Sequence, residues 1–289
     1  MSNNLEQRTA GPGELYLVAT PIGNLEDMTA RAIHVLSQAD LVAAEDTRRT
    51  RQLLNHFGIS KPLVSYFQHN QLQREELLLG ALLEGKKIAL VSDAGMPGIS
   101  DPGTPLVQAA VAKGIRVLPI PGASASISAL AASGLPTDRF VFEGFLPRAG
   151  KERKGRLQVL AAEERTVILY EAPHRLRETL KDLQMTLGND RRIAVARELT
   201  KVYEEFWRGN LEEAVAEFDR REPRGEFSLV IEGRQPEKLA QIDWPELLSE
   251  VEASVSGGDS PSDAIRNVAK RYDISRRQLY EAYQEKRRP

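Results

Sequence analysis

Apolar residues gather in short runs along residues 13–133, and amphipathic stretches separate one run from the next. The runs predict strands at 14–20, 41–44, 62–66, 86–91 and 115–120. The first amphipathic stretch is expected to form a helix that is capped by Asn24 and reaches Ala39. Strands that alternate with helices in this way favour a mostly parallel sheet.

Three of these strands end in loops rich in glycine and proline, at 21–24, 92–103 and 121–125. Glycine allows positive φ and lets a ligand come close to the backbone. Loops that follow parallel strands fall on one side of a sheet, so these three can build one pocket. A set of merely rigid turns is the alternative.

The second half continues with strand patterns at 139–145, 166–170, 193–197, 202–207 and 227–232. The glycine-containing stretch 147–156 is strongly basic, and we expect it to be a loop. These patterns predict an α/β protein with an N-terminal α/β domain at 13–134 and a second α/β domain at 135–234.

The chain beyond the polar stretch 235–243 has a helical pattern. Helices at 264–271 and 276–283 would have the spacing of a helix-turn-helix, which predicts a small helical C-terminal domain at 240–289. Its core is expected to contain Ile265, Val268, Ala269, Ile274, Leu279 and Tyr280. Clustered Arg and Lys residues make this segment look basic, which suits either a solvated face or nucleic-acid contact.

Composition narrows the class of protein. Hydrophobic residues make up 41% and charged residues 28% of the chain, which is ordinary for a soluble globular protein. The net charge of −2 predicts no general affinity for polyanions, so any nucleic-acid contact must come from local basic patches. The absence of cysteine excludes disulfides and suits the cytoplasm. The polar first residues and the lack of an apolar run of about 20 residues predict neither a signal peptide nor a membrane span.

Acidic side chains cluster in or beside the loops that follow strands: Glu45, Asp46, Asp93, Asp101 and Glu171. Each of them could brace a loop or cap a helix, and together they suit a ligand that carries hydroxyl groups and positive charge. Ser124 is expected to cap the helix that follows it. The four histidines lack metal-ligand spacing, so no metal site is predicted.

Several spaced motifs then match a known family in order. They are P-I-G-N-L at 21–25, A-E-D-T-R at 44–48, S-D-A-G-x-P at 92–97, D-P-G at 101–103, P-G at 121–122, Y-E-x-P-H-R at 170–175, R-E-L-T-K at 197–201 and G-E at 225–226. Through them, residues 13–285 closely resemble the tetrapyrrole methylase superfamily, or class III methyltransferases, and within it the branch that acts on ribosomal RNA.

The resemblance implies a two-domain tetrapyrrole methylase fold with S-adenosylmethionine in the cleft between the domains. It further implies methyl transfer to the ribose 2′-oxygen of a cytidine in 16S rRNA, as free RNA or in the 30S subunit, by a homodimer. The loop that reads G-x-G-P-G-D-P in the tetrapyrrole enzymes is T-P-I-G-N-L at 20–25 here. That departure favours RNA over a porphyrinoid substrate.

The resemblance also implies roles for residues. We expect S-adenosylmethionine to be bound by Pro21, Ser92, Asp93, Ala94, Gly95, Ser124, Ala125 and Glu171. A ribose hydroxyl is a poor nucleophile, so a nearby base would help, and the candidates are Asp46, Asp101, Glu171 and His174. RNA is expected to contact Arg48, Arg148, Lys151, Arg153, Lys154, Arg276 and Arg277.

Two alternatives remain at this point. One is a methyltransferase of a small tetrapyrrole, against which the basic stretch and the helix-turn-helix pattern argue. The other is a non-enzymatic nucleic-acid-binding protein, which would have no need for elaborate glycine and proline loops. Binding of S-adenosylmethionine would distinguish an enzyme from a nucleic-acid-binding protein. The identity of the methyl acceptor would distinguish the rRNA methyltransferase from a tetrapyrrole methyltransferase.

Overall fold

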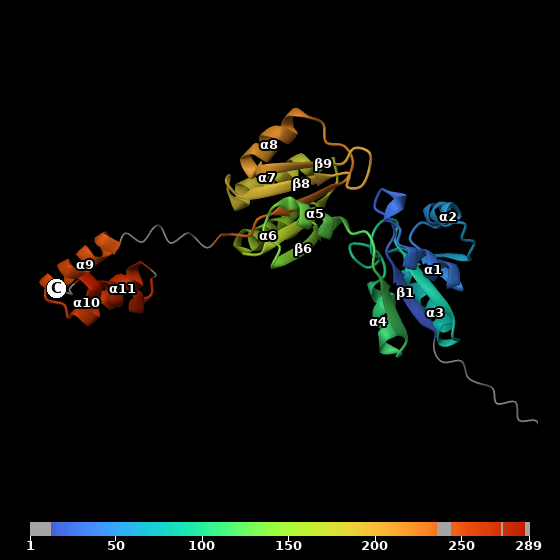
Figure 1. The fold of residues 1–289 in the computed structure, drawn as a ribbon, viewed down its shortest axis with the longest axis horizontal. Helices are drawn as coiled ribbons and strands as arrows, with labels where there is room; N and C mark the ends of the chain where they lie inside the picture. Colours follow the sequence, from blue (N-terminus) through green and yellow to red (C-terminus); the bar gives the residue numbers. More distant parts are fainter. Residues whose placement is uncertain (1–12, 236–243, 273, 287–289) are drawn as a thin grey trace, which may run out of the picture. The chain divides into compact units, whose positions relative to one another are not determined.

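A computed structural model describes residues 13–235, 244–272 and 274–286 (Figure 1). The chain divides into two compact units, one up to Arg234 and one from Gln235. The first unit contains two sheets, each of five strands, together with their helices. In the part of the chain that the structure describes, no helix is long and apolar enough to cross a membrane.

The first sheet has the strand order β3-β2-β4-β1-β5, and all its pairings are parallel, which confirms the predicted topology. Its strands are β1 (Glu14–Val18), β2 (Leu41–Ala44), β3 (Leu63–Ser65), β4 (Lys87–Val91) and β5 (Arg116–Ile120). The helices along this part of the chain are α1 (Ala30–Gln38), α2 (Thr47–His56), α3 (Gln71–Leu83), α4 (Thr104–Ala112) and α5 (Ala125–Ser133).

Alternation along β2 explains how both faces of the first sheet are covered. Val42 and Ala44 belong to one apolar cluster, with Leu36 of α1 and Leu54 of α2. Ala43 belongs to a second cluster, to which α3 and α4 contribute. Successive side chains of a strand point to opposite faces, so a fully apolar strand needs helices on both sides.

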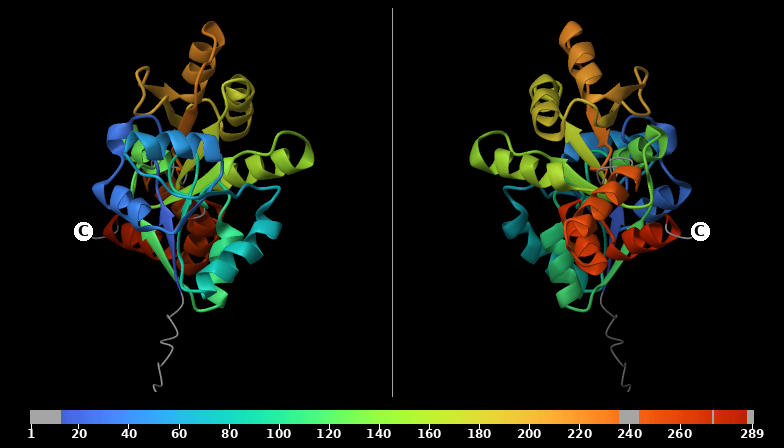
Figure 2. Two further views of the ribbon diagram at one scale, coloured as in Figure 1. Left: turned by 90° about the vertical axis from the view of Figure 1, so that its right-hand side faces the viewer. Right: turned by 90° about the vertical axis from the view of Figure 1, so that its left-hand side faces the viewer.

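The second sheet has the order β6-β7-β10-β8-β9, in which only β6 and β7 run parallel. Its strands are β6 (Phe140–Phe145), β7 (Thr166–Glu171), β8 (Arg192–Arg197), β9 (Glu205–Asn210) and β10 (Phe227–Ile231). The helices α6 (Gly150–Ala162), α7 (Leu176–Leu187) and α8 (Leu211–Arg220) pack on one face (Figures 1 and 2). Helix α5 packs on the other face, although it precedes the boundary expected at residue 134.

Three elements differ from the sequence-based expectation. Asn24 caps only a short 3₁₀ turn, η1 (Leu25–Asp27), and Thr29 caps α1, because Met28 between them is extended. The strand expected at 202–207 is shifted to β9, and the Val202 side chain is 92% exposed in the preceding turn.

The basic stretch at 147–156 is also different, because most of it is the start of helix α6 rather than a loop. Arg153, Leu157 and Leu160 are the buried residues of this helix, at the i, i+4 and i+7 positions of one face. The abundance of charged residues concealed that pattern in the sequence.

The second unit consists of α9 (Trp244–Ser256), α10 (Pro261–Arg271) and α11 (Arg276–Lys286). The expected core is largely confirmed, except that Tyr283 is buried and Tyr280 is exposed. Tyr283 follows the buried Leu279 by four residues, so both lie on one face of α11. Residues 261–289 contain eight Lys or Arg and four Asp or Glu, so this tail is basic as expected, while residues 244–260 add four Asp or Glu and no Lys or Arg.

Candidate active site

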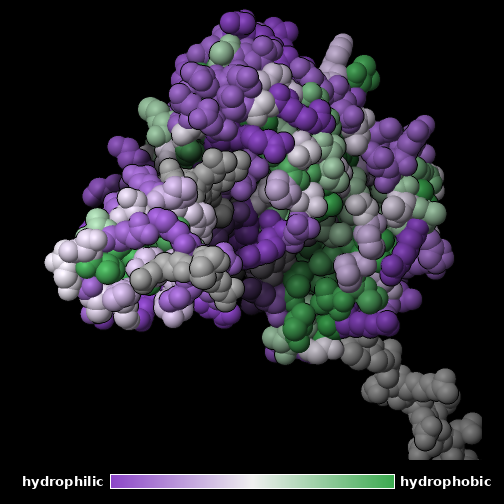
Figure 3. All heavy atoms as spheres, turned by 60° about the vertical axis from the view of Figure 1, so that its left-hand side comes forward, coloured by the Kyte–Doolittle hydropathy of each residue, from purple (hydrophilic) through white to green (hydrophobic). Residues whose placement is uncertain are grey.

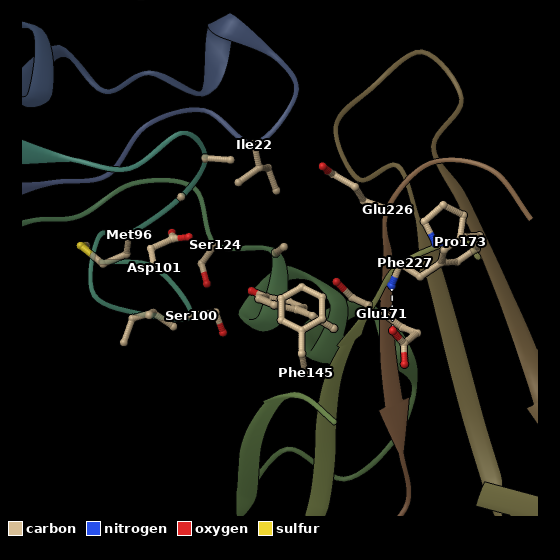
Figure 4. Close-up of a pocket in the computed structure, with 17 residues that line it drawn as sticks. Ile22, Met96, Ser100, Asp101, Ser124, Phe145, Glu171, Pro173, Glu226 and Phe227 are labelled. Atoms are coloured by element: carbon tan, nitrogen blue, oxygen red, sulfur yellow. Dashed lines mark hydrogen bonds between the residues drawn. The ribbon is translucent and has the colours of Figure 1, made fainter. Parts of the chain in front are cut away.

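A cavity of about 390 Å³ lies between the strand-end loops of the first sheet and the second sheet (Figure 4). The first sheet contributes loop residues after β1 and β4 and at the start of α5, and the second sheet contributes the ends of β6 and β7 and the start of β10. The volume is in the range of small-molecule sites. The three predicted loops therefore do meet at one pocket.

Two backbone hydrogen bonds fasten the first of these loops to the second. The Thr20 N–H donates to the Gly95 carbonyl at 2.9 Å, and the Gly95 N–H donates to the Thr20 carbonyl at 3.0 Å. Gly95 has a φ of +81°, and a Cβ placed there would lie 3.6 Å from Ile22 Cγ2. Glycine therefore allows the left-handed backbone conformation at this position and leaves no side chain on this part of the cavity wall.

Five of the eight residues predicted to bind the cofactor line the cavity: Ala94, Gly95, Ser124, Ala125 and Glu171. Pro21, Ser92 and Asp93 do not. The Ser92 hydroxyl is buried and donates to the Gly95 carbonyl at 3.3 Å, so it braces the loop from behind. Asp93 accepts a hydrogen bond from the Asp46 N–H at 3.1 Å and pairs with Arg49.

Ser124 stands at the N-cap position of α5, but its side chain makes no capping hydrogen bond. Its hydroxyl lies 3.2 Å from that of Ser126 instead. The expectation that Ser124 caps this helix through its side chain is therefore wrong, and the hydroxyl remains at the cavity wall.

Among the four candidate bases, Asp101 has an environment that raises its basicity. Burial is the main cause, and the negative charge of Glu45 adds to it, so the pKa of Asp101 is raised to about 6. Burial also raises the pKa of Glu45 itself. A carboxyl group whose pKa approaches the working pH is a better proton acceptor than an ordinary aspartate.

Glu171 lines the cavity but is committed to neighbouring groups. It is only 2% exposed, and its carboxylate accepts hydrogen bonds from Thr179 Oγ1 at 2.6 Å and the Ala172 N–H at 2.9 Å. The Arg175 side chain also lies 3.5 Å from it. These contacts make Glu171 a brace between β7 and α7 and leave it a poor candidate for exchanging protons.

Asp46 and His174 lie outside the cavity lining. The Asp46 carboxylate caps α2, and hydrogen bonds from the backbone and side chain of Arg48 hold its pKa below the ordinary value. His174 is exposed in the turn before α7. Neither position favours a catalytic base.

The basic residues predicted to contact RNA differ in how exposed their side chains are. Arg153 is 5% exposed, pairs with Asp182 at 2.8 Å and donates to Thr179 Oγ1 at 2.9 Å. The prediction that Arg153 binds RNA is wrong, because its guanidinium belongs to the network that also holds Glu171. Arg148, Lys151 and Lys154 are exposed.

The other predicted RNA contacts already have partners. Arg48 pairs with Asp46 at 3.3 Å. In the second unit, Arg276 donates to the Ser262 hydroxyl at 2.9 Å, and Arg277 pairs with Glu281 at 2.8 Å. Exposed pairs of this kind are weak and can be exchanged for other partners, so these residues stay predictions.

The sequence-based reading missed most of the wall that the second sheet contributes. Phe145, Tyr170 and Phe227 all line the cavity. Their apolar character indicated core strands, and only their positions at strand ends pointed to a site. Across the described ranges, no group of three or more His, Asp or Glu side chains could hold a metal ion.

Comparison with known proteins gives one matching family model, tetrapyrrole (corrin/porphyrin) methylases, over residues 14–215. Relatives named ribosomal RNA small subunit methyltransferase I are close in sequence. The one from Synechocystis is 55% identical over 269 residues, or 93% of this chain and 96% of the relative. The one from Halalkalibacterium halodurans is 50% identical over 280 residues, or 96% of each chain, and the one from Bacillus subtilis is 48% identical over 275 residues, or 94% of each.

Solved structures share the fold at lower identity. A cobalt precorrin-4 methyltransferase superposes with a TM-score of 0.59 at 17% identity, covering 76% of this chain and 94% of the other. A uroporphyrin-III C-methyltransferase from Thermus thermophilus, complexed with S-adenosyl homocysteine, gives 0.53 at 23% identity, covering 75% and 97%. The two-sheet arrangement of the first unit is thus that of the methylase fold.

Proposed function

The chain belongs to the tetrapyrrole methylase family and, within it, to the ribosomal RNA small subunit methyltransferase I proteins, and we propose that it methylates 16S rRNA with S-adenosylmethionine as donor. The acceptor that we propose is the ribose 2′-hydroxyl of a cytidine in the decoding region. The observation that carries the proposal is identity of about half to relatives of this name over nine-tenths of both chains.

The cavity is our proposed site for S-adenosylmethionine. Its wall contains Ala94, Gly95 and Ala125, and the lack of bulky side chains at these positions leaves backbone groups near the cavity. The carboxyl group of Asp101 in the same wall suits a ligand with a positively charged sulfur. When bound, S-adenosylmethionine supplies a methyl group activated for attack by an oxygen.

Asp101 is the general base that the site favours. It lines the cavity, and its raised pKa suits removal of a proton from the ribose 2′-hydroxyl. In the transfer the 2′-oxygen gains a bond to the methyl carbon, the carbon–sulfur bond breaks, and the hydroxyl proton passes to Asp101. Correct placement of the reacting oxygen supplies much of the remaining rate enhancement.

Two copies of the chain are proposed to form a cytoplasmic homodimer. Leu77 and Leu83 of α3 and Val111 of α4 are exposed apolar side chains on neighbouring helices. Apolar side chains gather in one area of the face shown in Figure 3. Exposed apolar patches commonly mark protein contacts. Analytical ultracentrifugation of the wild type and of Val111→Glu would test this, with a monomeric wild type contradicting it.

Methyl transfer to three acceptors tests the proposed activity. Radiolabelled S-adenosylmethionine is incubated with the protein and 30S subunits, free 16S rRNA or a uroporphyrinoid. We expect label only in RNA, at a cytidine that alkaline hydrolysis then fails to cleave on its 3′ side, because a 2′-O-methyl group blocks attack by that oxygen. Label in the uroporphyrinoid alone would overturn the proposal, and binding of RNA without transfer would favour a non-enzymatic protein.

A further inference from the structure

Phe145 is a large apolar side chain at the cavity that nothing in the proposed chemistry uses. It ends β6, lines the cavity and is 54% exposed (Figure 4). A single exposed apolar residue on a protein surface is ordinary. The case for a function therefore rests on how this ring is held and on what surrounds it.

A β-bulge sets the direction of this ring. The pairing of β6 with β7 shifts between Phe142 and Gly144, after which Phe145 stands opposite Tyr170. Gly144 has a φ of +69°, and a Cβ there would lie 3.1 Å from Ser100 Oγ. Bulges beside active sites commonly re-aim a side chain, and here the bulge brings the Phe145 ring to the cavity.

Tyr170 supports the ring without covering it. The two ring centroids are 5.7 Å apart and the planes meet at 61°, so Tyr170 does not stack flat on Phe145. Tyr170 is itself fixed, because its hydroxyl accepts a hydrogen bond from the Ser126 N–H at 3.1 Å and its ring contacts Phe142. Phe145 is thus a supported aromatic ring with open surface at the mouth of the cavity.

Free cations follow directly along the chain. Arg148, Lys151 and Lys154 lie just after β6 and at the start of α6, and all three are exposed. Among the described residues, their side chains take part in no hydrogen bond or ion pair. An aromatic platform beside cations is the combination that binds single-stranded nucleic acid, with bases on the ring and phosphates on the cations. S-adenosylmethionine also contains a base, but it has no phosphate for these cations to bind.

We propose that Phe145 is the stacking platform for the acceptor nucleobase, which leaves its neighbours in the RNA so that its ribose can reach the methyl donor in the cavity. This inference rests on the proposed function, because it concerns the RNA acceptor of the same site. Enzymes that act on a nucleotide inside a folded nucleic acid commonly extrude it and stack it on aromatic side chains. Phe145 is a positioning residue, and Asp101 remains the group that exchanges the proton.

The test uses the full chain with Phe145→Leu, which removes the aromatic ring, and Phe145→Trp, which preserves stacking. Phe140→Leu is the matched control, because Phe140 is also exposed on β6 but at the end away from the cavity lining. The measurements are affinity for 30S subunits in the presence of S-adenosyl homocysteine, affinity for S-adenosyl homocysteine alone, and single-turnover methylation.

Phe145→Leu is expected to weaken binding of 30S subunits by about tenfold or more, because one stacked base is lost. Affinity for S-adenosyl homocysteine should change much less, because leucine keeps this part of the cavity lining apolar. Phe145→Trp should restore binding of 30S subunits, and RNA should quench its added fluorescence. A loss of affinity for S-adenosyl homocysteine as large as the loss for 30S subunits would place the ring on the cofactor's adenine and overturn the proposal, as would wild-type affinity for 30S subunits. A wild-type protein that does not methylate 30S subunits would instead overturn the proposed function.

Discussion

The negative charge of Glu45 acts on the carboxyl group of Asp101 and, after the larger effect of burial, helps to raise the Asp101 pKa to about 6. The two residues come from loops that follow different strands of the first sheet, β2 and β4. The parallel arrangement of those strands is what brings them to the same edge. This relationship gives the proposed base a measurable signature.

The rate of single-turnover methylation by the wild type should rise with pH around a midpoint near 6, as Asp101 loses its proton. Glu45→Gln removes a neighbouring negative charge, so the Asp101 pKa should fall and the midpoint should move to lower pH. Glu84→Gln is the control, because Glu84 is an exposed carboxylate that pairs with Lys86. An unchanged midpoint in Glu45→Gln would contradict the assignment.

Asp101→Asn provides the complementary measurement. It should reduce the single-turnover rate by about 100-fold or more and abolish the rise near pH 6, while affinity for S-adenosyl homocysteine stays close to wild type. Because the folded state raises this pKa above 3.8, protonation favours folding and the charged form disfavours it. The variant should therefore be no less stable than the wild type at pH 8, which separates loss of the base from loss of the fold.

Gly95→Val should weaken binding of S-adenosylmethionine. The Gly95 Cβ position already contacts Ile22 Cγ2 at 3.6 Å and the Ala123 carbonyl at 3.7 Å, so two further methyl groups must enter the cavity or push its wall away. Valine at positive φ is also strained by about 1–3 kcal/mol. Gly58→Val carries similar strain, because Gly58 has a φ of +68°, with no atom near its Cβ. Calorimetry should show lost affinity in Gly95→Val alone, and equal affinities would remove this loop from the cofactor site.

Arg153→Gln should lower the free energy of unfolding by about 3 kcal/mol, because it leaves Asp182 without its largely buried partner. Thr179 would lose the hydrogen bond from Arg153 as well, which loosens the support of Glu171. Lys154→Gln is the control, because Lys154 is the next residue of the same helix and its side chain is exposed. It should change the free energy of unfolding by less than about 0.5 kcal/mol. Denaturant unfolding compares the two, and equal stabilities would mean that the network contributes little.

These residues also show which features of the fold and of the site could be predicted from the sequence. The parallel first sheet and the meeting of its loops followed from apolar runs and from glycine and proline positions, which depend on local chemistry. Arg153 and Lys154 are adjacent cations in the sequence, and only the packing of α6 against α7 decides which of them is buried. Phe145 was not predicted as a site residue for a similar reason. A bulge in β6 turns its ring to the cavity, and no pattern of residues in the sequence indicates that bulge.

The dependence of RNA affinity on salt should distinguish two candidate RNA-binding surfaces, one formed by Arg148, Lys151 and Lys154 and the other by Arg276 and Arg277. Each phosphate contact releases counterions, so removing one contact reduces the slope of log affinity against log salt by about 0.7–0.9. Changing Arg148, Lys151 and Lys154 together to Gln should reduce the slope by about 2, because these cations have no acidic partner among the described residues. Arg276→Gln with Arg277→Gln should reduce the slope less, because residues 244–289 contain as many Asp and Glu as Lys and Arg. Binding to 30S subunits at several KCl concentrations gives both slopes, with circular dichroism to verify folding. A larger reduction of the slope in the Arg276/Arg277 double variant than in the triple variant would instead make the C-terminal helices the main phosphate-binding surface.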